Sequence, residues 1–381
     1  MDVTIVGAGL GGLAAAVAAH RAGHAVTVFE RGAELREKGA GIGLLPNAVL
    51  ALDRLGLGAA VRERATPPGT STGLRDRHGH PLLAADQSQV VARTGAPFAV
   101  VPRPWLHRLL VSALPDGAVL TDAPVEDVTT IAGDVVIAAD GAYSAARALL
   151  FPRHPGLVGS GETAARAIAP HTPDGSVFGE FLDHRTGERS GALAMSDGRV
   201  YWYATWRESV VGPAPTDPAQ RLHWLATRRA DWHPQIVEMI TSTAPDAVHV
   251  TETAQLATPL TEFHRGRIAL LGDAAHAMTP DLGQGGGQAF EDAVALRTVL
   301  TGAGPADVES ALARYSALRV PRVTEILDAA RSANRMLGLR GPRARTRDLL
   351  LRLVPRSAAT RTMARQLKFE PPATMLAGAG R

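Results

Sequence analysis

Three glycines near the N-terminus are spaced to hold a phosphate group. They form the pattern G-x-G-x-x-G at Gly7, Gly9 and Gly12, between an apolar stretch and an alanine-rich stretch. In such a pattern the first glycine permits a tight turn, the second lets a pyrophosphate approach the backbone, and the third lets a helix pack close to a strand. Free N–H groups at the start of that helix add a partial positive charge. The spacing therefore predicts a pyrophosphate site, with Gly11 in the same turn.

A carboxylate follows at the distance expected for a ribose ligand. Glu30 ends the next apolar stretch, near the spacing of about 20 residues that is typical of dinucleotide sites. Its oxygens can accept hydrogen bonds from ribose hydroxyls, and its charge would repel a 2′-phosphate. We include the neighbouring Arg31 in the predicted site. This first motif indicates an ADP moiety, which NAD and FAD share.

A second glycine-rich segment favours a flavin. An apolar stretch at 267–271 leads into Gly272 and Asp273, and Asp273 could accept a hydrogen bond from a sugar-alcohol hydroxyl. A loop containing Pro280 follows, and then the start of another helix. A reduced flavin carries negative charge at its N1–C2=O edge, which free backbone N–H groups at a helix start would stabilise. The glycines that we expect at this edge are Gly283, Gly285 and Gly286.

These motifs occur in an order that resembles a known family. The chain is similar to the aromatic-hydroxylase group of FAD-dependent monooxygenases, which includes the p-hydroxybenzoate and salicylate hydroxylases. The matching segments are 7–12 with Glu30, 41–47 with Gly43, Arg103, 134–147 with Asp140, 272–285, and Tyr315 with 319–322. The resemblance implies that Arg103 reaches the FAD, that Gly43 belongs to a loop beside the flavin, and that the segment around Asp140 serves FAD and nicotinamide binding.

The resemblance also implies a reaction. NADH or NADPH would bind transiently and reduce a bound FAD, O2 would form a C4a-hydroperoxide, and one oxygen atom would pass to a small aromatic or heteroaromatic substrate, with natural products among the candidates. No second G-x-G-x-x-G unit exists for a separate nicotinamide domain, and the absence of cysteine argues against a disulfide reductase. Two alternatives stay open: a reductase or isomerase on the same fold, and a flavin-binding protein without turnover.

Candidates for catalysis are few, and the sequence does not identify a base that activates the substrate. Arg166 could bind an anionic substrate or the nicotinamide, or be a surface arginine of a strand. Tyr203 shares one face of a predicted strand with Tyr201, and one face of that strand should line the pocket. His276 could act in catalysis or serve a structural role. Two further side chains are expected beside the flavin edge, Asp281 and Gln284.

The elements that would position these residues indicate an α/β protein. We expect a Rossmann-like FAD domain of the glutathione-reductase type, an inserted and mainly antiparallel β-sheet substrate domain, and C-terminal helices. A strand at 2–6, a helix at 13–22 and a strand at 25–29 would open the first domain, whereas 67–97 reads as irregular strands and turns. The predicted boundaries are 1–70, 98–155 and 263–340 for the FAD domain, 71–97 and 156–262 for the substrate domain, and 341–381 for the C-terminal helical segment.

Composition narrows the class of protein further. The net charge is only +3, from 40 basic and 37 acidic residues, so a nucleic-acid partner is not expected. The basic stretch at 331–365 is interpreted as a solvated helical face. There is no run of about 18 apolar residues, which argues against stable membrane insertion and favours a cytoplasmic protein. No metal-ligand spacing is present, and the oligomeric state stays open.

Overall fold

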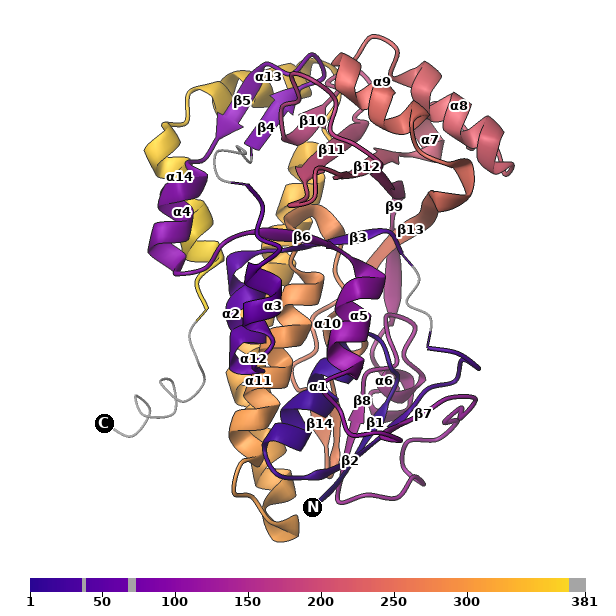
Figure 1. The fold of residues 1–381 in the computed structure, drawn as a ribbon, viewed down its shortest axis with the longest axis vertical. Helices are drawn as coiled ribbons and strands as arrows, with labels where there is room; N and C mark the ends of the chain where they lie inside the picture. Colours follow the sequence, from indigo (N-terminus) through magenta and orange to yellow (C-terminus); the bar gives the residue numbers. More distant parts are fainter. Residues whose placement is uncertain (36–38, 68–72, 370–381) are drawn as a thin grey trace.

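Two large sheets lie toward opposite ends of an elongated molecule (Figure 1). The computed structural model describes residues 1–35, 39–67 and 73–369. A six-stranded sheet lies near the N-terminus, and a seven-stranded sheet lies at the other end. A two-stranded ribbon, β3 (Gly41–Leu44) with β6 (Ala99–Pro102), lies between them. The arrangement is the α/β architecture with C-terminal helices that the sequence predicts.

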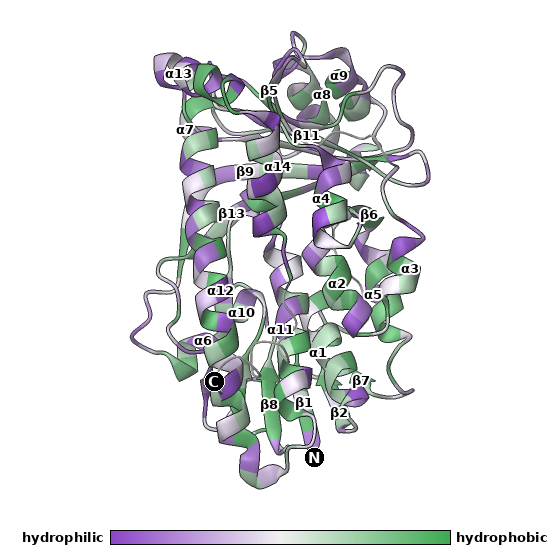
Figure 2. Ribbon diagram, turned by 90° about the vertical axis from the view of Figure 1, so that its left-hand side faces the viewer, coloured by the Kyte–Doolittle hydropathy of each residue, from purple (hydrophilic) through white to green (hydrophobic). Residues whose placement is uncertain are grey.

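The six-stranded sheet is built on short apolar strands. Its central strands are buried, as in β8 (Val135–Ala138), and β1, β2, β8 and β15 pair in parallel. Strands covered on both faces read as continuous apolar runs rather than alternating ones, and Figure 2 shows β1 and β8 as largely hydrophobic. The strand order is β14 (His264–Arg265), β15 (Ile268–Leu270), β8, β1 (Asp2–Val6), β2 (Ala25–Phe29) and β7 (Val119–Leu120).

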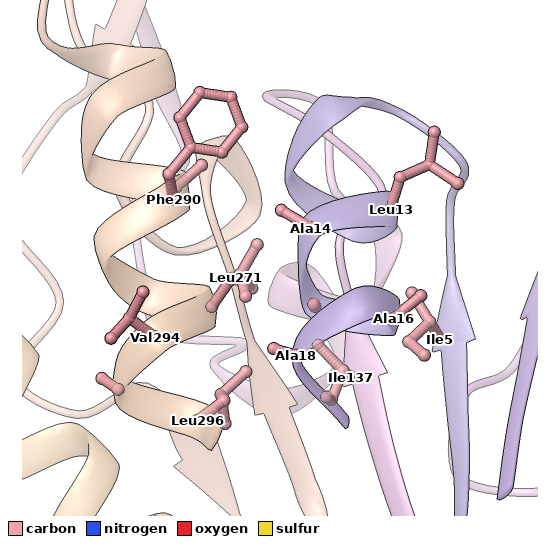
Figure 3. Close-up of a cluster of buried hydrophobic side chains, with 14 of the residues drawn as sticks. Ile5, Leu13, Ala14, Ala16, Ala18, Ile137, Leu271, Phe290, Val294 and Leu296 are labelled. Atoms are coloured by element: carbon pink, nitrogen blue, oxygen red, sulfur yellow. The ribbon is translucent and has the colours of Figure 1, made fainter. Parts of the chain in front are cut away.

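Two helices begin at the edge where these parallel strands end. They are α1 (Leu10–Arg21) and α11 (Gly285–Leu300), and they pack against each other. Ala14 and Ala18 of α1 carry small side chains, so the two helices approach closely beside the sheet (Figure 3). Helix α1 starts three residues earlier than the predicted residue 13, because the last two glycines of the turn already have helical conformation. This packing brings the two predicted phosphate and flavin sites to one edge of the sheet.

The seven-stranded sheet is antiparallel apart from one parallel pair, β10 (Gly179–Leu182) with β4 (Gly73–Asp76). On β12 (Val200–Trp206), Trp202 and Trp206 face a cluster formed with helices α8 (Pro218–Arg228) and α9 (Pro234–Thr241), whereas Tyr201 and Tyr203 face the other way. This alternation follows from the period of two in a strand. The remaining strands are β13 (His249–Leu256), β9 (Leu157–Ala169), β11 (Arg189–Ala194), β10 (Gly179–Leu182), β4 (Gly73–Asp76) and β5 (Pro81–Ala84).

One predicted segment is corrected. Residues 67–97 were expected to form only irregular strands and turns, but they include helix α4 (Gln87–Thr94). The carboxylate of Asp86 accepts a hydrogen bond of 3.1 Å from the N–H of Gln89, and Gly95 ends the helix with a φ of +81°. Both are helix-boundary signals that the sequence carried.

The other helices cover the sheets and connect them. Helix α12 (Val308–Leu337) is the longest, with Pro321 inside it, and no helix in the described ranges is long and apolar enough to cross a membrane. Strands β4 and β5 join the same sheet as β9 to β13, and the domain boundaries given above stay predictions. The remaining helices are α2 (Pro46–Arg54), α3 (Gly58–Arg62), α5 (Arg103–Val111), α6 (Ala145–Leu150), α7 (Glu208–Val211), α8 (Pro218–Arg228), α9 (Pro234–Thr241), α10 (Asp273–His276), α13 (Gly341–Arg352) and α14 (Arg356–Gln366), with short 3₁₀ turns η1 (Pro245–Ala247), η2 (Pro280–Leu282) and η3 (Pro305–Asp307).

Candidate active site

A single cavity of about 1240 Å³ extends from the glycine turn of α1 to the seven-stranded sheet. It also reaches the start of α11, the β3–β6 ribbon and helix α14. Among the predicted cofactor residues, those that line it are Gly9, Gly11, Gly43, Arg103, Gly272, Asp273, Pro280, Gly283, Gly285 and Gly286. The fold therefore brings the two predicted half-sites, more than 250 residues apart in the chain, to one continuous space.

The first glycine turn has the shape that a pyrophosphate needs. Gly7 has a φ of +105°, and a Cβ there would lie 2.5 Å from the carbonyl oxygen of Ala139. A Cβ on Gly12 would overlap the carbonyl oxygen of Gly7. At Gly9, in contrast, an added Cβ meets no atom of the described residues within 4 Å, although the residue lines the cavity. Gly7 and Gly12 are thus required by packing, while Gly9 leaves the backbone open to a ligand.

Glu30 is held at the end of β2 by two backbone hydrogen bonds. Its Oε2 accepts a hydrogen bond of 2.8 Å from the N–H of Ala8, and its Oε1 accepts one of 2.8 Å from the N–H of Gly32. A carboxylate oxygen has a second lone pair, so both oxygens can still accept from ribose hydroxyls. Arg31 is exposed and does not line the cavity.

The flavin half-site combines a strained turn with a helix start. Gly272 has a φ of +62° and leads directly into Asp273, and Gly283 has a φ of +63° just before α11 begins. Asp140 does not line the cavity, although Ala139 and Gly141 on either side of it do. Its Oδ2 accepts a hydrogen bond of 3.1 Å from the N–H of Ala146, and its buried Oδ1 has no partner among the described residues. The carboxylates of Glu30 and Asp273, together with the backbone N–H groups at the two helix starts, fit an FAD.

The tyrosines and Arg166 lie on the opposite wall. Tyr201 and Tyr203 both line the cavity, as the predicted alternation requires, and the ring of Tyr201 packs against Gly41 of the ribbon. Arg166 on β9 also lines the cavity and donates a hydrogen bond of 2.6 Å from Nη1 to the hydroxyl of Thr251. Burial raises the pKa of Tyr201, so its hydroxyl stays protonated.

A buried charged cluster that sequence reasoning missed completes this wall. Arg189 of β11 pairs with the carboxylates of Glu162 and Glu180, the latter at 3.0 Å, and with Asp281 at 2.9 Å. Glu180 and Arg189 line the cavity near Tyr203. Burial raises the pKa of Glu180, against the opposing effect of Arg189. The available signal was Glu180, a charged residue within the otherwise apolar strand β10, which is rare unless the charge is paired.

His276 does not reach the cavity. Its Nε2 lies 2.7 Å from Oδ2 of Asp292, and Arg319 donates a hydrogen bond of 2.6 Å from Nε to the other oxygen of that carboxylate. Burial alone would raise the pKa of Asp292, but its contacts with His276 and Arg319 lower it to about 2. This geometry favours the structural role over the catalytic one. Gln284 is likewise buried, and its Oε1 accepts a hydrogen bond of 2.9 Å from Asn47.

Comparison with known proteins agrees with this geometry. A family model described as an FAD binding domain matches residues 1–119 and 115–330. The chain is 34% identical over 343 residues to the aurachin C monooxygenase/isomerase of Stigmatella aurantiaca, covering 86% of this chain and 87% of that one. It is 33% identical over 366 residues to the 3-amino-4-hydroxybenzoate 2-monooxygenase PtnB3 of Streptomyces platensis, covering 91% of each. The crystal structure of Klebsiella pneumoniae HpxO with FAD and uric acid is similar with a TM-score of 0.85 and 28% identity, covering 96% of each chain.

Proposed function

Since the chain belongs to the family that has this FAD binding domain and is an FAD-dependent monooxygenase, we propose that it consumes NADH or NADPH and O2 and adds one oxygen atom to a small aromatic or heteroaromatic compound. The observation that carries this proposal is the single cavity that joins the two FAD half-sites to a wall of aromatic and charged side chains. The relatives named for their substrates act on rings that carry hydroxyl, amino or ring N–H groups.

The residues of the two half-sites would bind and orient the cofactor. Gly9 exposes its backbone to the pyrophosphate, Glu30 accepts from the ribose, and Asp273 accepts from the sugar-alcohol chain. The N–H groups at the start of α11 would stabilise negative charge on the ring system. Bound FAD supplies the electron transfer from nicotinamide and the activation of oxygen, which the chain's own side chains cannot supply.

The residues of the opposite wall would hold the substrate. Tyr201 and Tyr203 present aromatic surface on which a planar ring can pack. Glu180 lies beside them in a buried site that raises its pKa, so its carboxylate is a stronger proton acceptor than an exposed one. We assign Glu180 the role that the sequence left open, which is to accept the proton of a phenol or ring N–H at its carboxylate oxygen.

The purified protein can be tested in turn for bound FAD, for reduction by nicotinamide and for oxygen transfer to a substrate. A bound yellow chromophore should be released as FAD, and NADH or NADPH should bleach it without oxygen. A panel that starts with urate and 3-amino-4-hydroxybenzoate should then identify a compound that accelerates nicotinamide oxidation. Equal consumption of nicotinamide and O2, with one ¹⁸O atom from ¹⁸O2 in the product, is the expected result.

Other outcomes assign a different function. A product without ¹⁸O would make the protein a reductase or isomerase on the same fold. A bound flavin that neither nicotinamide bleaches would instead make it a flavin-binding protein without turnover.

A further inference from the structure

Helices α13 and α14, joined by a short turn at residues 353–355, lie at the end of the molecule far from the N-terminus, and we call this helix–turn–helix segment the hairpin (Figure 1). Its tip carries four exposed apolar side chains, which we call the apolar tip: Leu349, Leu350, Leu353 and Val354. Their exposed fractions are 60%, 59%, 70% and 40%. A single exposed leucine is ordinary, but four large apolar side chains within six residues form a patch that marks an interaction surface.

The helices beside the apolar tip are strongly basic. Residues 340–368 contain eight arginines and one lysine, against Asp348 as the only acidic residue. Arg347 already binds Asp348 at 2.7 Å. Four other arginines are exposed and form no ion pair within the described residues: Arg343, Arg345, Arg361 and Arg365.

The hairpin is firmly attached to the rest of the protein, so the exposed tip is not a frayed end. Ala344, Thr360 and Ala364 are buried, and the hydroxyl of Thr360 accepts a hydrogen bond of 2.8 Å from the N–H of Asp86. The inner side of α14 also forms part of the cavity wall, through Ala358, Ala359, Thr362, Met363 and Gln366. Val354 of the apolar tip also lines the cavity, whereas the three exposed leucines and the four unpaired arginines lie outside its lining.

We propose that this hairpin binds the surface of an anionic lipid bilayer. Leucines at the tip would enter the boundary between headgroups and acyl chains, and the arginines around them would contact lipid phosphates. Charge complementarity selects this occupant over a second copy of the chain, because two identical basic faces would repel each other. The protein lies on the bilayer without crossing it, and the interface places the α14 wall of the cavity beside lipid.

Vesicle flotation of the full-length protein with its flavin bound tests this proposal without any enzyme assay. We expect the protein to float with phosphatidylcholine vesicles that contain phosphatidylglycerol and to stay behind with phosphatidylcholine alone, and salt should weaken the binding. The double variant Leu350→Ser/Leu353→Ser should bind at least about tenfold more weakly. The double variant Arg343→Gln/Arg345→Gln should lose about tenfold or more.

Matched controls separate the hairpin from general surface effects. Leu149→Ser removes a leucine that is 48% exposed on α6, and Arg153→Gln removes an exposed arginine, both outside the hairpin. Both should float like the unaltered protein, and all variants should keep their flavin absorbance and melting temperature. The proposal fails if the unaltered protein does not float at low salt, or if the controls lose as much binding as the hairpin variants. It also fails if Leu350→Ser/Leu353→Ser splits a dimer and leaves flotation unchanged, because the tip is then an interface between copies.

Discussion

Arg189 of β11 and Asp281 of η2 form an ion pair of 2.9 Å in which both side chains are almost fully buried. One residue belongs to the seven-stranded sheet, and the other belongs to the turn just before α11. The pair therefore connects the wall proposed to hold the substrate with the helix start proposed to face the flavin. Asn334 of α12 reinforces this connection, because its amide donates to Asp281 at 3.2 Å.

Replacing Arg189 by methionine should destabilise the protein strongly. The change leaves the carboxylates of Glu162, Glu180 and Asp281 buried without their shared cation. Loss of one partner from a buried ionic group costs roughly 3–5 kcal/mol. Urea unfolding at neutral pH measures this. Arg199→Met is the control, because that arginine forms only a surface pair with Asp197 and should cost no more than about 1 kcal/mol. Equal losses would contradict a special role for the cluster.

Two glycines of the N-terminal turn should respond oppositely to alanine. Gly9→Ala adds a methyl group into open space, so the melting temperature without added FAD should hardly change. FAD affinity should fall by roughly tenfold or more, because the methyl group occupies the approach of the pyrophosphate. Gly12→Ala instead overlaps the carbonyl of Gly7 and should lower stability itself. Melting curves with and without FAD measure both effects. If Gly9→Ala leaves FAD affinity unchanged, the assignment of this turn as the pyrophosphate site is wrong.

The glycine motifs could be predicted because they depend on local geometry. The positive φ at Gly7 and the close packing at Gly12 both require glycine, so this turn is visible as a pattern within a few residues of the sequence. The same holds for the apolar strands and for the alternation of Tyr201 and Tyr203 on β12. In each case the sequence pattern and the local structure that it predicts involve the same few consecutive residues.

The charged cluster could not be predicted because its members meet only through the tertiary fold. Glu162, Arg189 and Asp281 come from β9, β11 and η2, and nothing in their spacing shows that they pair. His276 shows the same limit, because its partner Asp292 lies in the following α-helix and the buried contact between them, which favours the structural role, cannot be read from the sequence. Helix α4 was missed for a different reason: its boundary residues, Asp86 and Gly95, are also typical of turns.

Glu180→Gln should slow substrate-dependent nicotinamide oxidation by about a hundredfold, if Glu180 accepts the substrate's proton. The glutamine keeps the shape of the side chain and cannot take up a proton. The dependence of the rate on pH should also flatten, which a purely structural role would not produce. Glu238→Gln on α9 lies outside the cavity and serves as the control. A variant with the normal pH profile would exclude Glu180 as the base.

Glu180→Gln should also change how the free energy of unfolding depends on pH. Burial raises the pKa of Glu180 in the folded protein above its unfolded value of about 4.3. Its favourable contribution is therefore complete below that unfolded value and is lost as pH rises through the folded pKa. Unfolding free energies of the unaltered protein minus those of Glu180→Gln should fall over this range. A difference that stays constant with pH would contradict the raised pKa.

Asp292 should control stability at the acidic end of the range. Its folded pKa of about 2 lies below the unfolded value of about 3.9, so its contribution is present above pH 4 and is lost as pH falls toward 2. Asp292→Asn keeps an acceptor for the N–H of Gly272, which donates to the carboxylate at 3.0 Å. It removes the buried negative charge beside His276 and Arg319, and it leaves Arg319 with Glu291, at 2.8 Å, as its remaining buried carboxylate partner among the described residues. We expect a loss of roughly 3 kcal/mol at neutral pH that shrinks as pH approaches 2. Urea unfolding between pH 2 and 7 measures both curves, with the exposed Asp174→Asn as the control. If the loss is the same at every pH, the stabilisation by Asp292 comes from packing and hydrogen bonding rather than from its charge.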